Sequence, residues 1–441
     1  MQRAITEVMD RGETLVLDLH KKYLQETKPS AFFHELNKAA IERFEFLKFP
    51  HSKHEMYTFA NTKELAQTRF DLQRKNAVEE SFIRKHIYAG CEASFIALID
   101  GIYRPDLSTA AGLDPRISVS SFDKAVAVPD IKRYLLNTIG EENDVFASIN
   151  SAFLHQGVFL EVEHATQMEA PLQILCVSSG SAGASVMTVP RILVKVGQNA
   201  EIKLVVKYVG VTGNYFVNAV QDFILEKNSK VVFTQVQSDA PSAWHFSKNR
   251  IQMPGNSRFI STNTSSGNKL ARHHYEAHLK GSGAELMLNG LSILRGEEQV
   301  HNFIRVHHEA PQCVSNQHFK NIVNDRSRFS FDGTVIVNRG AQLTNSNQLI
   351  NNLMLSDDAH AESKPNLMIF ADDVKCTHGS TVGRLNEEQL FYLNTRCLSQ
   401  DAAKTLLTRS FAESVLDAIQ FPAVVQDLRE TILKKLEAKH A

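Results

Sequence analysis

The sequence has no excess of charge of either sign and no long hydrophobic run. Its 441 residues include 48 Lys and Arg against 49 Asp and Glu, a formal net charge of -1. Proteins that bind nucleic acid or anionic membranes usually carry a positive excess, so this balance argues against both partners. No apolar stretch approaches the roughly 18 residues that a membrane-spanning helix needs. We therefore expect no nucleic-acid partner, no export signal and no membrane anchor.

Cysteine is scarce, and its spacing does not suggest disulfides. The chain has five, an odd number with no C-x-x-C motif: Cys91, Cys176, Cys313, Cys376 and Cys397. A secreted disulfide framework has an even set at close spacing. We therefore expect reduced thiols and a cytoplasmic location.

Common catalytic motifs are also missing. There is no Gly-Lys dipeptide and hence no Walker A loop, so the chain itself is not expected to hydrolyse ATP. The Gly-Ser segments at 180–183 and 281–283 lack the spacing of a nucleophile elbow and of a dinucleotide-binding loop. We expect a non-catalytic protein. The alternative is a β-helix polysaccharide lyase or hydrolase, whose acidic pairs would be Asp357, Asp358, Asp372 and Asp373.

Hydrophobic periodicity divides the chain into three regions. The first is mainly helical, with helical spacing at 33–47 after the capping residue Ser30 and again at 131–139, and with a short hairpin at 93–103. The second has short alternating runs such as EIKLVVKY, and the third is helical again. We predict an N-terminal helical domain, a β core and a C-terminal helical domain, at residues 1–145, 146–385 and 386–441.

Turn-forming segments punctuate the central region. They include GQNA at 197, KNSK at 227, PGNS at 254 and KGSGA at 280, with no helix-length apolar pattern between them. Turns at this spacing predict many short strands. A sandwich, a propeller and a solenoid all bury alternating residues of such strands, so the spacing alone does not distinguish them. The length of the region favours the solenoid, as does a cluster of asparagines suited to side-chain amide ladders: Asn345, Asn347, Asn351 and Asn352.

The chain changes from strand to helix between Met368 and Leu398. Up to Cys376 apolar residues alternate, and from Asn386 onward they recur every three to four positions. Because strand side chains alternate between faces, Cys376 and His378 would share a face. Iron–sulfur clusters usually take four ligands, mainly thiolates with an occasional imidazole, so this pair would need ligands from elsewhere. The alternative is a small buried cysteine beside a hydrogen-bonded histidine.

The C-terminal region carries helix-start signals and two apolar stripes, of which the first is the candidate contact surface. Asn386 with Gln389 resembles a capping box, Ser399 is a second capping residue, and Pro422 stands where a third helix would begin. Short terminal helices have little core of their own, so the stripes must pack on the β region or on a partner. The first stripe consists of Leu406, Leu407, Phe411, Val415 and Ile419.

The last third of the chain resembles a known family. The segment ADDVKCTHGSTVGRLNEEQLFYL at 371–393 resembles the hallmark of the SufB/SufD family of iron–sulfur cluster assembly scaffolds. The resemblance continues upstream through 306–337 and 341–367 and downstream through 399–416. Near the N-terminus, HSKHEMYTF lacks the tryptophan of the family's K-x-E-x-W-K-Y-T motif.

This resemblance implies a fold, partners and site residues. The fold is a right-handed parallel β-helix, and the partners are a SufB-like subunit, joined as a heterodimer, and a SufC-like ABC ATPase. Cys376 and His378 would lie at the cluster-assembly interface and bind metal only together with the partner subunit. The apolar stripe at 406–419 would supply candidate contacts to the ATPase. No cofactor would be bound stably by this chain alone, which would hold a transient iron–sulfur cluster with its partners. A third possibility, separate from the resemblance, is a structural homodimer formed by the isolated chain.

A row of histidines offers one further, less favoured site. His274, Glu276 and His278 alternate along a predicted strand and would share one face. Imidazole and carboxylate groups bind transition metals. Ordinary polar side chains on a sheet surface are the simpler interpretation.

Overall fold

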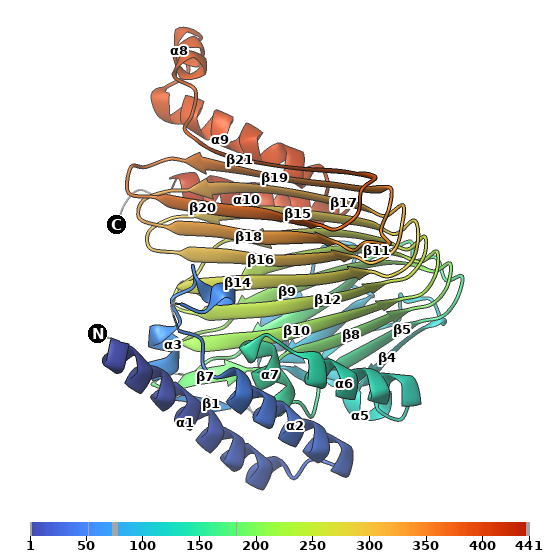
Figure 1. Cartoon of the computed structure of the whole chain (residues 1–441). Helices are drawn as coiled ribbons and strands as arrows, with labels where there is room; N and C mark the ends of the chain where they lie inside the picture. The colour runs from blue at the N-terminus through green and yellow to red at the C-terminus, as the bar shows by residue number, and fades with distance from the viewer. Residues whose placement is uncertain (1, 52, 73–77, 182, 438–441) are drawn as a thin grey trace.

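The central region is a parallel β-solenoid (Figure 1). The structure, a computed structural model, describes residues 2–51, 53–72, 78–181 and 183–437. Successive strands of the central region alternate between two sheets, and most strand pairs are parallel. A strand pairs with the strand two places along the chain, as stacked coils require and as a sandwich or propeller does not. The predicted parallel β-solenoid is therefore confirmed.

The two sheets, here called sheet A and sheet B, contain all the strands of the described residues. Sheet A runs β4 (Ile117–Ser121), β5 (Val158–Val162), β8 (Arg191–Val196), β10 (Tyr215–Leu225), β12 (Trp244–Met253), β14 (Leu270–Leu279), β16 (Gln299–His308), β18 (Arg328–Val337) and β20 (His360–Ile369), with β1 (Phe70–Leu72) and β7 (Ser185–Thr188) at its side. Sheet B runs β3 (Ile102–Tyr103), β2 (Phe95–Ile99), β6 (Leu172–Ser178), β9 (Glu201–Gly210), β11 (Lys230–Ser238), β13 (Arg258–Ser265), β15 (Glu285–Leu294), β17 (Val314–Val323), β19 (Thr344–Met354) and β21 (Val374–Gly383).

The predicted turns coincide with a column of left-handed residues. Asn199, Asn228 and Asn256 have φ of 59°, 58° and 55° in successive coils, and Gly283 follows with 74°. Asparagine and glycine tolerate this conformation better than other residues do. The Asn228 side chain donates a hydrogen bond to Asn199 Oδ1 at 2.9 Å. The turn segments therefore stack as well as end the strands.

Amide side chains also form hydrogen-bonded ladders between adjacent strands, as predicted for the asparagine cluster. Asn321 Nδ2 donates to Asn352 Oδ1 at 2.9 Å on adjacent strands of sheet B. Asn351 Nδ2 donates to Thr381 Oγ1 at 2.8 Å one strand further on. These bonds join β17, β19 and β21 in fixed register. Between the sheets, apolar side chains of successive coils form one continuous core, for example Val231, Phe259 and Leu286.

The N-terminal helices cover the outer face of sheet A at one end of the solenoid (Figure 1). Phe146 packs edge-on against Phe216 and Phe246 of the sheet. The helices predicted near 33–47 and 131–139 are both present. The helical segments are α1 (Gln2–Thr27), α2 (Ala31–Leu47), η1 (Glu55–Tyr57), α3 (Lys63–Gln67), α4 (Glu80–Lys85), η2 (Pro105–Leu107), α5 (Phe122–Ala125), α6 (Pro129–Glu141) and α7 (Val145–Ala152).

Strands within the first 145 residues belong to the solenoid. β1 pairs with β7, β2 with β6 and β4 with β5. The predicted hairpin at 93–103 is β2 and β3, and its turn residues Asp100 and Gly101 have φ of 51° and 84°. The N-terminal region thus shares both sheets with the central region.

A buried ionic cluster joins the start of α7 to sheet A. The Asp144 carboxylate contacts Arg272 at 2.8 Å, His274 at 2.7 Å and the Tyr57 hydroxyl at 2.7 Å. Asp144 also accepts the Phe146 amide at the start of α7, at 3.0 Å. Burial alone would raise the pKa of Asp144, but Arg272 and His274 hold it well below its usual value. The carboxylate is therefore ionised and paired inside the protein.

Three C-terminal helices follow the last strand: α8 (Glu387–Thr395), α9 (Gln400–Leu416) and α10 (Pro422–Glu437). Asn386 caps α8 by accepting the Glu388 and Gln389 amides, at 2.8 and 3.1 Å. Ser399 caps α9 through the Ala402 amide at 3.2 Å, and α10 begins at Pro422, as predicted. Among the described residues, no helix is both long enough and apolar enough to cross a membrane.

Candidate functional site

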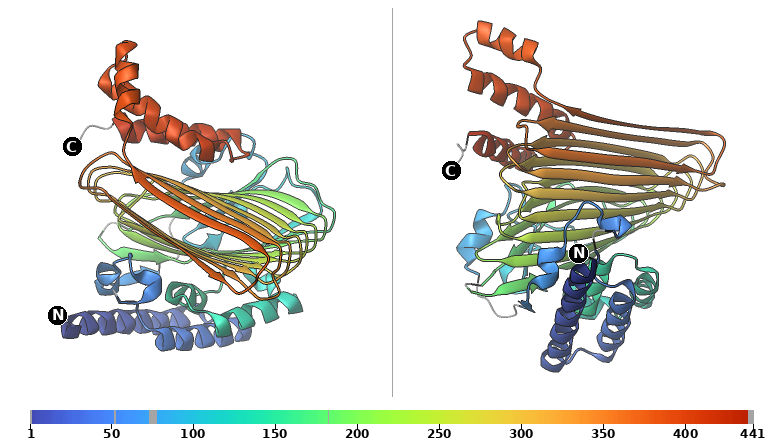
Figure 2. Two further views of the ribbon diagram at one scale, coloured as in Figure 1. Left: turned by 45° about the horizontal axis from the view of Figure 1, so that its top comes forward. Right: turned by 60° about the vertical axis from the view of Figure 1, so that its left-hand side comes forward.

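The C-terminal end of the solenoid has two open sheet edges. β20 is the last strand of sheet A and β21 the last of sheet B, and no strand in the described part of the chain pairs with their outer edges. α9 packs along the outer face of sheet B, against β15 and β17, instead of covering this end (Figure 2). Unpaired backbone groups at a strand edge can pair with another chain. The end of the coil is therefore available to a second protein.

Cys376 and His378 lie on one face of β21, as the alternation predicts. In register, Cys376 is opposite Ser346 and His378 is opposite Gln348, and both of those β19 side chains are buried between the sheets. Because no coil follows, Cys376 is only half-buried and His378 is exposed. Both residues thus face the inside of the coil at the point where it opens to solvent.

The thiol of Cys376 favours its protonated form in the isolated chain. Burial raises its pKa, and the Ser346 backbone hydrogen bond offsets only part of this effect. An imidazolium nearby would have lowered the pKa. A metal bound here would therefore have to displace the thiol proton.

The other cysteines are separate from this pair. All five are free, and Cys91, Cys176 and Cys313 are buried. Burial raises the pKa of Cys91 to about 12 and that of Cys176 further. Cys397, between α8 and α9, is exposed. Cys376 and Cys397 are therefore the two cysteines that a partner can reach.

Large apolar side chains are exposed around the open end. They come from the last coils and have exposed fractions of 37% to 58%: Leu343, Leu349, Met368, Ile369, Phe370 and Val382. Exposed large apolar groups are often part of protein interaction surfaces. We call these six residues the end patch.

The predicted C-terminal stripe divides into a buried and an exposed part. Val415 and Ile419 are buried against sheet B, with Val232 and Leu291 among the residues of the same cluster. Leu407 and Phe411 are partly buried, and Leu406 is 46% exposed. Val415 and Ile419 therefore serve the packing of α9 and are not surface contacts. α8 adds two exposed rings that the stripe did not include, Phe391 and Tyr392, at 70% and 56%.

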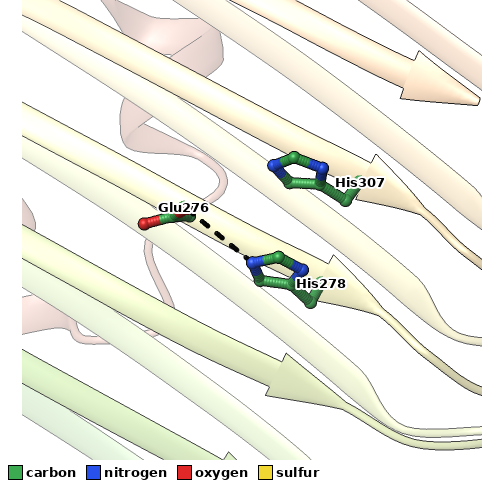
Figure 3. A group of neighbouring side chains, drawn as sticks. All are labelled: Glu276, His278 and His307. Atoms are coloured by element: carbon green, nitrogen blue, oxygen red, sulfur yellow. Dashed lines mark ion pairs between the residues drawn. The ribbon is translucent and has the colours of Figure 1, made fainter. Parts of the chain in front are cut away.

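The histidine row separates into two environments. His274 is buried and bonded to Asp144, whereas Glu276 and His278 are half-buried and lie beside His307 of β16 (Figure 3). Burial lowers the pKa of His278, but the nearby carboxylates of Glu276 and Glu309 raise it more, so that the net shift is upward. Sequence reasoning missed His307 and Glu309 here. The available signal was that His278 and His307 each stand near the end of their strand, just before a turn.

The acidic pairs of the polysaccharide hypothesis lie apart. The pair at 357–358 precedes β20 and the pair at 372–373 follows it. A strand of 10 residues spans roughly 30 Å, far more than the ~10 Å that separates paired carboxylates in glycosidases. Asp357 is moreover paired with Arg384. The two pairs therefore do not form one catalytic site.

Fold and site together define a class: a β-solenoid with an open, cysteine- and histidine-bearing end and helices at both termini. Comparison with protein families then identifies it. The family model described as SUF system FeS cluster assembly, SufBD core domain, matches residues 177–411, and the SufBD protein N-terminal region matches residues 15–174. The chain belongs to the SufBD family of the SUF iron–sulfur cluster assembly system.

Individual relatives agree with this assignment. The chain is 29% identical over 400 residues to an iron–sulfur cluster assembly SufBD family protein of Synechocystis, covering 88% of this chain and 87% of that protein. It is 26% identical over 344 residues to the iron–sulfur cluster assembly protein SufD of Escherichia coli, covering 77% and 79%. It is 31% identical over 314 residues to the chloroplastic protein ABCI7 of Arabidopsis thaliana, covering 68% and 65%.

Proposed function

We propose that this chain is a non-catalytic scaffold subunit that pairs with a SufB-like subunit and docks a SufC-like ATPase to build or deliver iron–sulfur clusters in the cytoplasm. The observation that carries the proposal is the open end of the solenoid. The last two coils carry unpaired edge strands, the six exposed residues of the end patch and the accessible Cys376 and His378.

A partner solenoid suits this end because it could pair with the open strand edges and also cover the exposed apolar side chains. Its own edge strands would pair with β20 and β21, and its apolar side chains would cover the end patch. Cys376 and His378 supply two ligand groups, whereas iron–sulfur clusters usually take four. The partner would therefore contribute the remaining ligands of a transient cluster.

The exposed side of α8 and α9 is the proposed docking surface for the ATPase. Leu406, Phe391 and Tyr392 are large and exposed there, while the opposite side of α9 is packed on sheet B. Arg384, Leu385 and Asn386 connect β21 to α8, so the strand that bears Cys376 is joined by a short link to the ATPase surface. Movement of a bound ATPase would thus alter access to Cys376 and His378.

The test of the site is the double substitution C376A/H378A in a cell that depends on this pathway. We expect a loss of cluster supply, measured as the activity of an iron–sulfur enzyme, because both ligand groups of this chain are gone. The matched control is C397A, which removes the other accessible cysteine and should leave supply unchanged. Normal cluster supply with C376A/H378A would disprove the site assignment.

The test of the pairing surface uses charge at the open end. V382K places a cation in the end patch and should prevent co-purification with the SufB-like subunit, because an unpaired charge would be buried at the interface. The isolated wild-type chain should form a homodimer through the same edges, and V382K should convert it to a monomer in size-exclusion chromatography with light scattering. Unchanged assembly in both experiments would place the interface elsewhere.

A further inference from the structure

The outer face of sheet A carries a second group of ligand-type side chains, away from the open end. β14 and β16 are parallel neighbours, and their register places His278 directly opposite His307. Glu276 is two residues before His278 and therefore on the same face. Figure 3 shows the three side chains together, with the carboxylate of Glu276 directed toward His278. Among the residues that the structure describes, these are the ones that meet as a metal-ligand set.

The distances are close to those of a metal site. One ligand atom from each residue lies within 4.8 Å of the others. Ligands of a tetrahedral zinc ion, with bonds of about 2.0 to 2.1 Å, are about 3.4 Å apart. The two imidazole rings are stacked, with centroids 4.5 Å apart and planes inclined by 4°. Binding an ion therefore needs a turn of the half-buried His307 ring and a decrease of up to about 1.4 Å in the distances between the ligand atoms.

Neighbouring charged groups already orient two of the three ligands. Glu309 Oε1 lies 2.6 Å from His278 Nδ1, which leaves His278 Nε2 directed to Glu276 Oε1 at 3.8 Å. Lys248 Nζ holds the other carboxylate oxygen of Glu276 at 2.7 Å. A carboxylate on the far nitrogen of a histidine is the usual second partner of a metal-binding imidazole. The cluster thus has both a ligand set and its supporting contacts.

We propose that Glu276, His278 and His307 bind one divalent first-row transition-metal ion, with an open coordination position toward solvent. Two imidazoles and one carboxylate form the donor set that proteins use for zinc and for non-haem ferrous iron, and it is a poor set for magnesium or calcium. The three residues are partly exposed, so an ion can reach them from solution. This site lies on β14 and β16 of sheet A and is separate from Cys376 and His378 on β21.

The experiment is titration of the metal-free full-length chain with Co²⁺ at pH 8, followed by visible absorption. We expect one saturable site per chain with the bands of four- or five-coordinate cobalt, reversed by Zn²⁺ and not by Mg²⁺. H278Q and H307Q should each weaken binding at least tenfold. E309Q should weaken it about tenfold, since loss of a supporting carboxylate costs 10- to 100-fold in affinity.

Two controls keep the outcome specific. H360Q changes an exposed histidine of β20 in the same sheet and should leave Co²⁺ affinity unchanged. C376A/H378A should also bind as wild type, so this result is independent of the proposed cluster interface. The proposal is overturned if the wild-type chain shows no saturable binding, if H278Q and H307Q both bind as tightly as wild type, or if Mg²⁺ displaces Co²⁺.

Discussion

At the scale of single residues, Asp144 is a buried carboxylate that links several elements. It contacts Tyr57, Arg272 and His274 and also caps α7, so it joins the N-terminal region to sheet A. The exposed surface pairs of the chain are of a different kind, because solvent screens them. The Asp144 cluster is inaccessible to water, and each charge in it depends on its partner.

We therefore predict that D144N lowers the free energy of unfolding by about 3 to 5 kcal/mol, since it leaves Arg272 buried without its carboxylate. The depressed pKa means that this stabilisation is present above the unfolded value near pH 4 and is lost as pH falls through the folded value. Urea denaturation followed by circular dichroism measures both effects. D123N, at an exposed position of α5, should change stability by less than about 0.5 kcal/mol. Equal stability of D144N and wild type would contradict the role of the cluster.

At the scale of elements, α9 has a buried side and an exposed side. Leu416 is fully buried in the cluster between α9, α10 and sheet B, and Lys320 Nζ donates to the Phe411 carbonyl at 2.8 Å. Leu406 on the same helix is 46% exposed. The helix therefore has one side packed on sheet B and one exposed side, which is the side proposed above for docking the ATPase.

We predict that L416A destabilises the chain by about 2 to 4 kcal/mol through the cavity that it leaves. L406A should cost less than about 0.5 kcal/mol but should weaken capture of the ATPase at least tenfold, because an exposed apolar anchor is lost. Denaturation curves and a pull-down with the purified ATPase separate the two effects. If L406A captured the ATPase as well as wild type, the docking surface would have to be moved away from α9.

The elements also show what the sequence could predict. Strand alternation placed Cys376 and His378 on one face, and turn chemistry located the ends of the coils, because both depend on neighbours in the chain. The contact of His278 with His307 depends instead on which residues stack between coils. The coils differ in length, since Lys230 is opposite Arg258, which is opposite Glu285, and Glu285 is opposite Val314. No fixed repeat exists from which that register could be read.

The same limit applies to the C-terminal stripe. Its spacing correctly indicated a helix, but spacing does not tell which part of the stripe meets the sheet and which part meets solvent. Val415 and Ile419 are buried because α9 packs on sheet B, a contact with strands far away in the sequence. Likewise, the pairing of β1, β2 and β4 with the solenoid is a long-range property that local helical periodicity does not reveal.

At the scale of the whole molecule, buried histidines make the fold sensitive to mild acid. Burial lowers the pKa of His20, His274 and His308 to about 4 and that of His301 to about 3. These imidazoles are neutral in the folded chain but gain protons below about pH 6.5 when it unfolds. The unfolded state therefore binds more protons, and stability falls as pH falls from about 6.5 to 4. The pKa of His278 is raised, so the folded chain binds a proton there more readily than the unfolded chain does. This one group adds stability as the pH falls and offsets at most one of the buried histidines.

We predict that the free energy of unfolding decreases between pH 6.5 and 4.5, with each buried neutral histidine contributing a slope of up to about 1.4 kcal/mol per pH unit. H301Q removes one such group, which is hydrogen-bonded to Ser330 Oγ at 2.5 Å, and should reduce the slope by about that amount whatever it does to stability at pH 7. Urea denaturation at half-unit pH steps measures the slope. H360Q, at an exposed histidine, should leave it unchanged. An H301Q slope equal to that of wild type would mean that His301 is already protonated in the folded chain.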